Sequence, residues 1–227
     1  MSPASDTALA NAVSAYATTL SGLLALALTT LMGAQPKRWL IAYLCVVVTG
    51  VATVWYHGFG ETFWPGLADI GTNLLLAWAL QVAVLGDFYT PTTRRRVAWL
   101  SGAVILTFIA WKVAVGPGSS SAFPVALGSF GGFNVGEVLL IANSLLVVGL
   151  FYARRAVIPQ NARPLLYLLT ATFFAGLLLA TASNHRVDLQ VMAYHATWHI
   201  VAAFGFIELW AFNHVRFAQV TSARQTG

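Results

Sequence analysis

The chain has 227 residues, of which 58% are hydrophobic and only 8% charged, and its mean hydropathy is +0.74. Soluble domains carry about 25% charged residues, so this composition excludes an ordinary soluble protein. The formal net charge of +5 would suit nucleic-acid binding in a soluble chain. Here the basic residues lie in short segments between apolar runs, where they set membrane topology, and we expect no nucleic-acid partner.

Apolar runs of about the 20 residues needed to cross a bilayer recur along the whole sequence. They predict an all-α integral membrane protein, a single seven-transmembrane helix bundle that occupies residues 1–227. The expected spans are 8–32, 39–56, 66–85, 97–115, 135–152, 164–183 and 189–212. The N-terminal segment "MSPASD" lacks the basic residues of a secretory signal, so the first run is expected to remain as a span.

Basic residues mark every second connection and thereby predict the topology. They follow the first, third and fifth spans and the last one: Lys37, Arg38, Arg94, Arg95, Arg96, Arg154, Arg155, Arg163, Arg216 and Arg224. The main exception is Lys112, and the Gly- and Ser-rich segment 116–134 is expected to be an extracytoplasmic loop. The positive-inside rule then gives an outside N-terminus and a cytoplasmic C-terminus. Only an odd number of spans satisfies this pattern. The short loops favour a bacterial inner membrane.

Ionisable residues within spans are costly in lipid and are therefore candidates for a functional site. His57 lies at the outer end of the second span, and Asp69 lies about one turn into the third. His195 and His199 lie in the first turns of the seventh span. With the predicted topology, all four side chains fall at a similar depth near the outer face.

This set of residues suits metal-assisted hydrolysis. His195 and His199 are i, i+4 neighbours on one helical face, and with His57 they would leave an open fourth position, which is typical of catalytic zinc. Asp69 would accept a proton from water. Thr53, one turn before His57, would donate to the developing oxyanion. The alternative for each is structural: a buried hydrogen-bonded histidine, or a threonine bonded to its own helix.

These residues resemble a known family. The pattern of Thr53 and His57 in "TVWYH", Asp69 in "GLADIGTN", and His195 and His199 in "YHATWH" is similar to that of the alkaline ceramidases. Their superfamily of seven-span putative metal hydrolases also includes the progestin and adipoQ receptors and the haemolysin III-like proteins. The resemblance implies a zinc ion held by the three histidines and hydrolysis of a ceramide-like lipid to a sphingoid base and a fatty acid.

The sequence departs from the family at three points. Thr53 stands where the family usually has serine, and Ile70 follows Asp69 where an acidic residue is common. The N-terminal acidic cluster that binds calcium in eukaryotic members has no counterpart, so the resemblance does not imply calcium dependence. The expected substrate is therefore an amide or ester of a lipid, with ceramide as one example.

Two other functions remain open. One is a receptor-like or haemolysin III-like membrane protein with structural zinc and no turnover. The other is a haem-binding membrane protein that uses His57 and one histidine of the seventh span as axial ligands. Haem would leave either His195 or His199 without a role, because neighbours on one helix cannot bind opposite faces of the same iron.

Overall fold

The computed structural model describes residues 3–33, 35–60, 62–117, 135–184 and 194–225. Within these ranges the chain is helical and has no strand. Seven of the described helices are long and apolar enough to cross a membrane, which agrees with the predicted seven-span bundle and with a multi-pass membrane protein. They are α1 (Pro3–Met32), α2 (Lys37–Phe59), α3 (Phe63–Phe88), α4 (Pro91–Val115), α6 (Val135–Ala153), α7 (Arg163–Asn184) and α8 (Tyr194–Gln225), with short 3-10 turns η2 (Arg155–Val157) and η3 (Gln160–Ala162) between α6 and α7.

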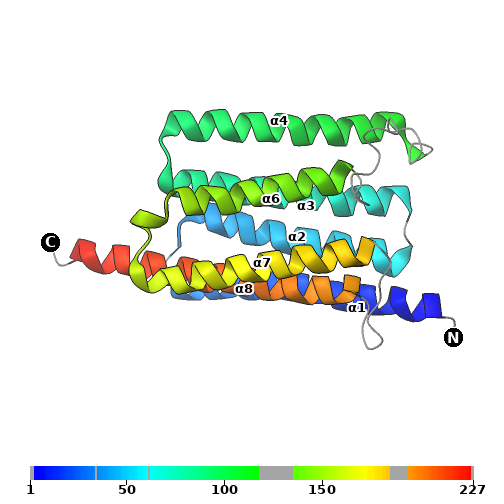
Figure 1. Ribbon diagram of the computed structural model, residues 1–227, viewed down its shortest axis with the longest axis horizontal. Helices are drawn as coiled ribbons and strands as arrows, with labels where there is room; N and C mark the ends of the chain where they lie inside the picture. The colour runs from blue at the N-terminus through cyan, green and yellow to red at the C-terminus, as the bar shows by residue number, and fades with distance from the viewer. Residues whose placement is uncertain (1–2, 34, 61, 118–134, 185–193, 226–227) are drawn as a thin grey trace.

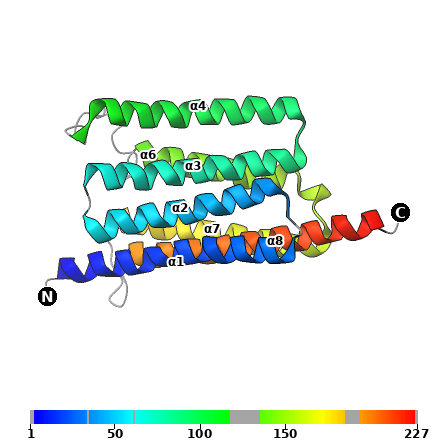
Figure 2. The same cartoon turned by 180° about the vertical axis from the view of Figure 1, so that it is seen from behind.

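The helices lie side by side and run alternately up and down the bundle, so the two termini are at opposite ends (Figure 1). The first and last helices pack together, since α1 contacts both α2 and α8. On the other side of α2, α3 packs against α4 and α6, while α7 packs on α8. The peripheral helix is α4, which lies at one edge in both views (Figure 2). The end of α2 therefore lies beside the starts of α1, α3 and α8.

The helix ends differ from the predicted spans where basic residues are present. The fourth helix begins at Pro91 instead of residue 97, because Thr90 caps it by accepting from the Thr93 amide at 3.3 Å and proline suits the first helical position. Residues 94–96, expected in a connection, thus lie in the first turns of α4. Residues 189–193 of the seventh predicted span and residues 118–134 of the predicted loop lie outside the described residues.

Two glycines allow α1 and α2 to approach closely. A Cβ at Gly22 would lie 2.8 Å from the Val47 amide nitrogen, and one at Gly50 would lie 2.8 Å from the Thr19 Cα. Small residues at such crossings bring helix backbones together in membranes. This close packing holds α1 against the helix that carries His57.

A buried ionic cluster joins α2, α3 and α8 at the end of the bundle nearer the C-terminus. Asp87 forms ion pairs with Arg38 and Arg216 and accepts from Trp39 Nε1 at 3.0 Å. Arg216 also donates from Nε to Asn213 at 2.8 Å. The prediction that Arg216 follows the last span is therefore wrong: α8 continues past residue 212, and Arg216 is only 4% exposed.

Candidate metal centre

The three histidines come together at the end of the bundle where the N-terminus lies. His57 is in the last turn of α2, and His195 and His199 are in the first two turns of α8. Nε2 of His57 lies 3.1 Å from Nε2 of His195, and the ring centroids of His57 and His199 are 5.3 Å apart. His57 and His199 are buried, and His195 is partly buried. Packing of α1 against both α2 and α8 explains how residues 138 positions apart meet.

The geometry of this cluster fits a metal ion. One nitrogen from each ring can be chosen so that all three lie within 4.8 Å of one another, and no other group of three His, Cys, Asp or Glu in the described part of the chain does this. For a tetrahedral ion at 2.0–2.1 Å from each ligand, two nitrogens lie about 3.3 Å apart. The 3.1 Å between the His57 and His195 nitrogens is close to that value. The cluster can therefore hold a metal ion.

A serine on α1 forms a hydrogen bond with His199. Ser14 Oγ donates to the carbonyl oxygen of Asn11 at 3.0 Å and lies 2.9 Å from Nδ1 of His199. A hydroxyl has one proton, and a carbonyl oxygen can only accept. When that proton is on the Asn11 carbonyl, the second contact is made by His199 donating from Nδ1. This tautomer leaves Nε2 with a free lone pair, which is the form that binds a metal.

The predicted carboxylate and hydroxyl also meet. Thr53 Oγ1 lies 2.5 Å from Asp69 Oδ1 and 2.9 Å from the carbonyl oxygen of Thr49 on its own helix. Both partners accept, so the hydroxyl shares its proton between them. To donate to a substrate oxygen, Thr53 must release Asp69. Since Thr53 and His57 are one turn apart on α2, the Thr53 end of this pair is offset from His57 by about one helical pitch, roughly 5 Å, along that helix.

A second donor holds Asp69 in place. Asn73, one turn later on α3, donates from Nδ2 to Asp69 Oδ1 at 3.3 Å and to the Asp69 carbonyl oxygen at 3.0 Å. These bonds go to Oδ1 and to the carbonyl oxygen, and no bond to Oδ2 of Asp69 is formed within the part of the chain that the structure describes. Asn73 was not identified from the sequence, although its position four residues after Asp69 in "DIGTN" places it on the same face of a helix. Ser14 has no comparable signal, because a lone serine in an apolar span is ordinary.

An apolar cavity of about 170 Å³ lies between the helix pairs α3/α6 and α7/α8. Asn73 and Trp198 line it at the level of the histidines, and Phe151, Leu166 and Leu209 line it towards the other end of the bundle. On α8 the lining runs from residue 198 to residue 209, which corresponds to about 16 Å at 1.5 Å per residue. The apolar cavity thus extends from Asn73, which bonds to Asp69, towards the middle of the bundle.

The chain was also compared with known proteins. No protein-family model matches the sequence, and no curated protein matches it significantly.

Proposed function

We propose that the protein is a zinc-dependent membrane hydrolase that cleaves a linear amide bond of a ceramide-like lipid. The observation that carries the proposal is the combination of three converging histidines with the Thr53–Asp69 pair about one helical turn away. We also propose that this end of the bundle faces the extracytoplasmic side of a bacterial inner membrane, as the loop charges favour.

His57, His195 and His199 would hold the zinc, with Ser14 keeping His199 in the ligating tautomer. Three protein ligands leave one position open, as in catalytic rather than structural zinc sites. When bound, zinc supplies a Lewis acid that polarises a carbonyl oxygen and acidifies water.

Asp69 is the proposed general base. It accepts a proton from the water that adds to the amide carbonyl carbon, and it returns the proton to the nitrogen as the C–N bond breaks. The products are a fatty acid and an amine. Thr53 and Asn73 hold the carboxylate before this transfer. A neutral carboxyl is a weaker acceptor than a carboxylate, so protonation of Asp69 releases the Thr53 hydroxyl to stabilise the oxyanion.

The apolar cavity supports a lipid substrate. Its walls are mostly aliphatic and aromatic side chains, with Asn73 as a polar group at the level of the site. An acyl chain would lie there while the amide group reaches Asp69. The haem alternative receives less support, because the His57 ring centroid lies only 4.8 Å from that of His195 and 5.3 Å from that of His199, which leaves no room for a porphyrin between either pair of rings.

Elemental analysis combined with an assay of fatty-acid release from ceramide tests the proposal. The wild type should contain one zinc per chain, and His195→Ala and His199→Ala should lose both the metal and the hydrolysis. His214→Ala is the matched control, since it removes a histidine from the same helix outside the cluster. Unchanged zinc and hydrolysis in His199→Ala would refute the proposal. Stoichiometric zinc with no turnover of any ceramide or acyl amide would favour the receptor-like alternative, and a Soret band would favour haem.

A further inference from the structure

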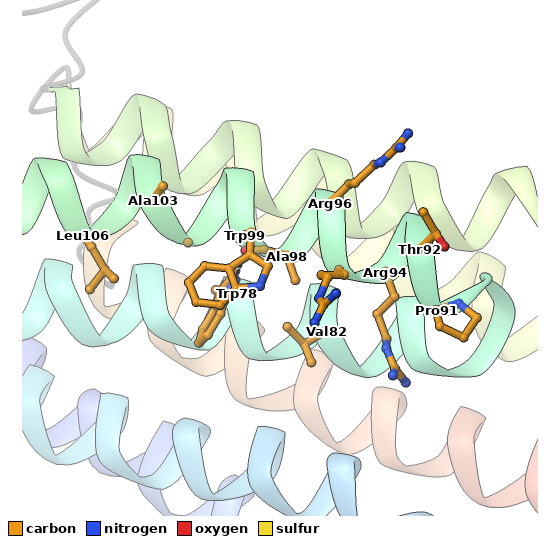
Figure 3. A pocket seen from close by; sticks show the side chains of 12 residues that line it. Trp78, Val82, Pro91, Thr92, Arg94, Arg96, Ala98, Trp99, Ala103 and Leu106 are labelled. Carbon is orange, nitrogen blue, oxygen red and sulfur yellow. Dashed lines mark hydrogen bonds between the residues drawn. The ribbon is translucent and has the colours of Figure 1, made fainter.

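A second and larger groove lies on the opposite half of the bundle, between α3 and the first part of α4. Its volume is about 910 Å³ (Figure 3). Trp78 forms its floor by donating from Nε1 to the carbonyl oxygen of Ala98 at 2.8 Å. Gly102 makes this possible, because a Cβ there would lie 3.1 Å from the same indole nitrogen. The floor is therefore built by specific packing between the two helices.

One end of this groove is strongly basic. Arg94, Arg95 and Arg96 line it, all three are exposed, and none of them forms an ion pair within the described part of the chain. Figure 3 shows Arg94 reaching towards α3, whereas Arg96 points away from it. The described residues that line the groove include no acidic side chain, and Asp87 is already paired in its own cluster. The positive charge at this end is left for an external anion.

The rest of the groove is apolar and follows α4 into the membrane span. Trp99 and Leu106 line it and are 72% and 59% exposed. From residue 96 to residue 106 the helix advances about 15 Å. A guanidinium group at the start of a span reaches the headgroup region while its helix stays in the hydrocarbon. The groove thus combines cations at headgroup depth with an apolar surface below them.

We propose that this groove binds one anionic glycerophospholipid from the leaflet on the C-terminal side of the bundle. The phosphate lies at the guanidinium groups of Arg94 and Arg95, and an acyl chain lies over Trp78 along α4. Basic pockets between spans recognise anionic headgroups in this way. A free anion would use only the basic end and would leave the apolar surface uncovered. The lipid would also cover α4, whose described span is only 17% buried within the protein.

Native mass spectrometry of the delipidated full-length protein tests this site by titration with phosphatidylglycerol or phosphatidylcholine of identical acyl chains. We expect one phosphatidylglycerol to bind preferentially. Each arginine contributes about 1 kcal/mol to the binding of an anionic lipid. We therefore expect the affinity for phosphatidylglycerol to fall about thirtyfold in Arg94→Gln/Arg95→Gln. The charge-matched control, Lys37→Gln/Arg155→Gln, removes two exposed cations outside the groove and should retain the preference.

A second pair of variants tests the apolar part. Ala103→Trp fills the groove and should weaken phosphatidylglycerol binding, whereas Val104→Trp, at an exposed neighbouring position that does not line the groove, should not. Equal binding of the two lipids by the wild type would overturn the proposal. The proposal would also be overturned if Arg94→Gln/Arg95→Gln and Lys37→Gln/Arg155→Gln weakened phosphatidylglycerol binding equally. Displacement of the lipid by millimolar inorganic phosphate, with no effect of Ala103→Trp, would assign the site to a free anion instead.

Discussion

Ser14→Ala isolates the contribution of a side chain that contacts no substrate in the proposed mechanism. Ser14 is buried and lies 2.9 Å from Nδ1 of the buried His199. It accepts from this nitrogen in the tautomer that leaves Nε2 free for a metal. Its loss leaves a buried N–H unpaired, at a cost of about 1–3 kcal/mol. His199 can relieve this cost by moving its proton to Nε2, the atom required for metal binding. We expect zinc affinity to fall about tenfold to a hundredfold, the range found when a partner of a metal-binding histidine is removed.

Competition with a chromogenic zinc chelator at constant pH measures this change directly. Ser21→Ala is the matched control, because Ser21 is also buried on α1 but donates only to its own helix, at the Thr18 carbonyl oxygen. Ser14→Thr keeps a hydroxyl and should restore part of the affinity. If Ser14→Ala bound zinc as tightly as the wild type and Ser21→Ala, the assigned tautomer of His199 would be wrong.

Three further substitutions test the site and the fold. Thr53→Val removes the hydroxyl with little change in shape, so ceramide hydrolysis should fall about a hundredfold while the zinc content stays unchanged. Thr53→Ser keeps the hydroxyl and should stay active. Wild-type rates in Thr53→Val would contradict the proposed role of the hydroxyl. Asp87→Asn leaves the buried Arg216 without a charge partner and should lower the free energy of unfolding by about 3–5 kcal/mol. Thermal denaturation in detergent measures this change. An unchanged unfolding midpoint would show that the ion pairs add no stability. Gly50→Ala should lower the free energy of unfolding by about 1–3 kcal/mol in the same assay. Gly149→Ala, with nothing within 4 Å of the added Cβ, should be neutral or stabilising. Equal effects of the two substitutions would argue against the close contact between α1 and α2.

Hydropathy predicted the number of helices because bilayer thickness fixes the length of an apolar span. It placed the start of α4 too late, because residues 94–96 are strongly polar although Thr90 and Pro91 begin the helix before them. The i, i+4 spacing of His195 and His199 was readable from the sequence. Their proximity to His57 was predicted only indirectly: the loop charges set the topology, and the topology places the three histidines at a similar depth in the membrane.

Contacts between distant helices could not be predicted in the same way. Ser14 lies 185 positions from His199, and nothing in its neighbourhood marks it as different from other serines in spans. Asp87 and Arg216 both lie near predicted span ends, where charged residues are normally solvated. Their burial depends on how α3 and α8 pack, which no periodicity in either segment encodes. The sequence thus predicts the elements and the candidate ligands, while tertiary packing determines what supports them.

The contact between α1 and α8 has a consequence for the order in which the centre is made. The ribosome releases α2 with His57 long before α8, which carries the other two ligands. A nascent chain that stops after α7 contains a single histidine of the cluster and cannot assemble the site. Assembly of the histidine cluster would therefore be the last step of biogenesis, completed only when the final helix has entered the membrane and docked on the first.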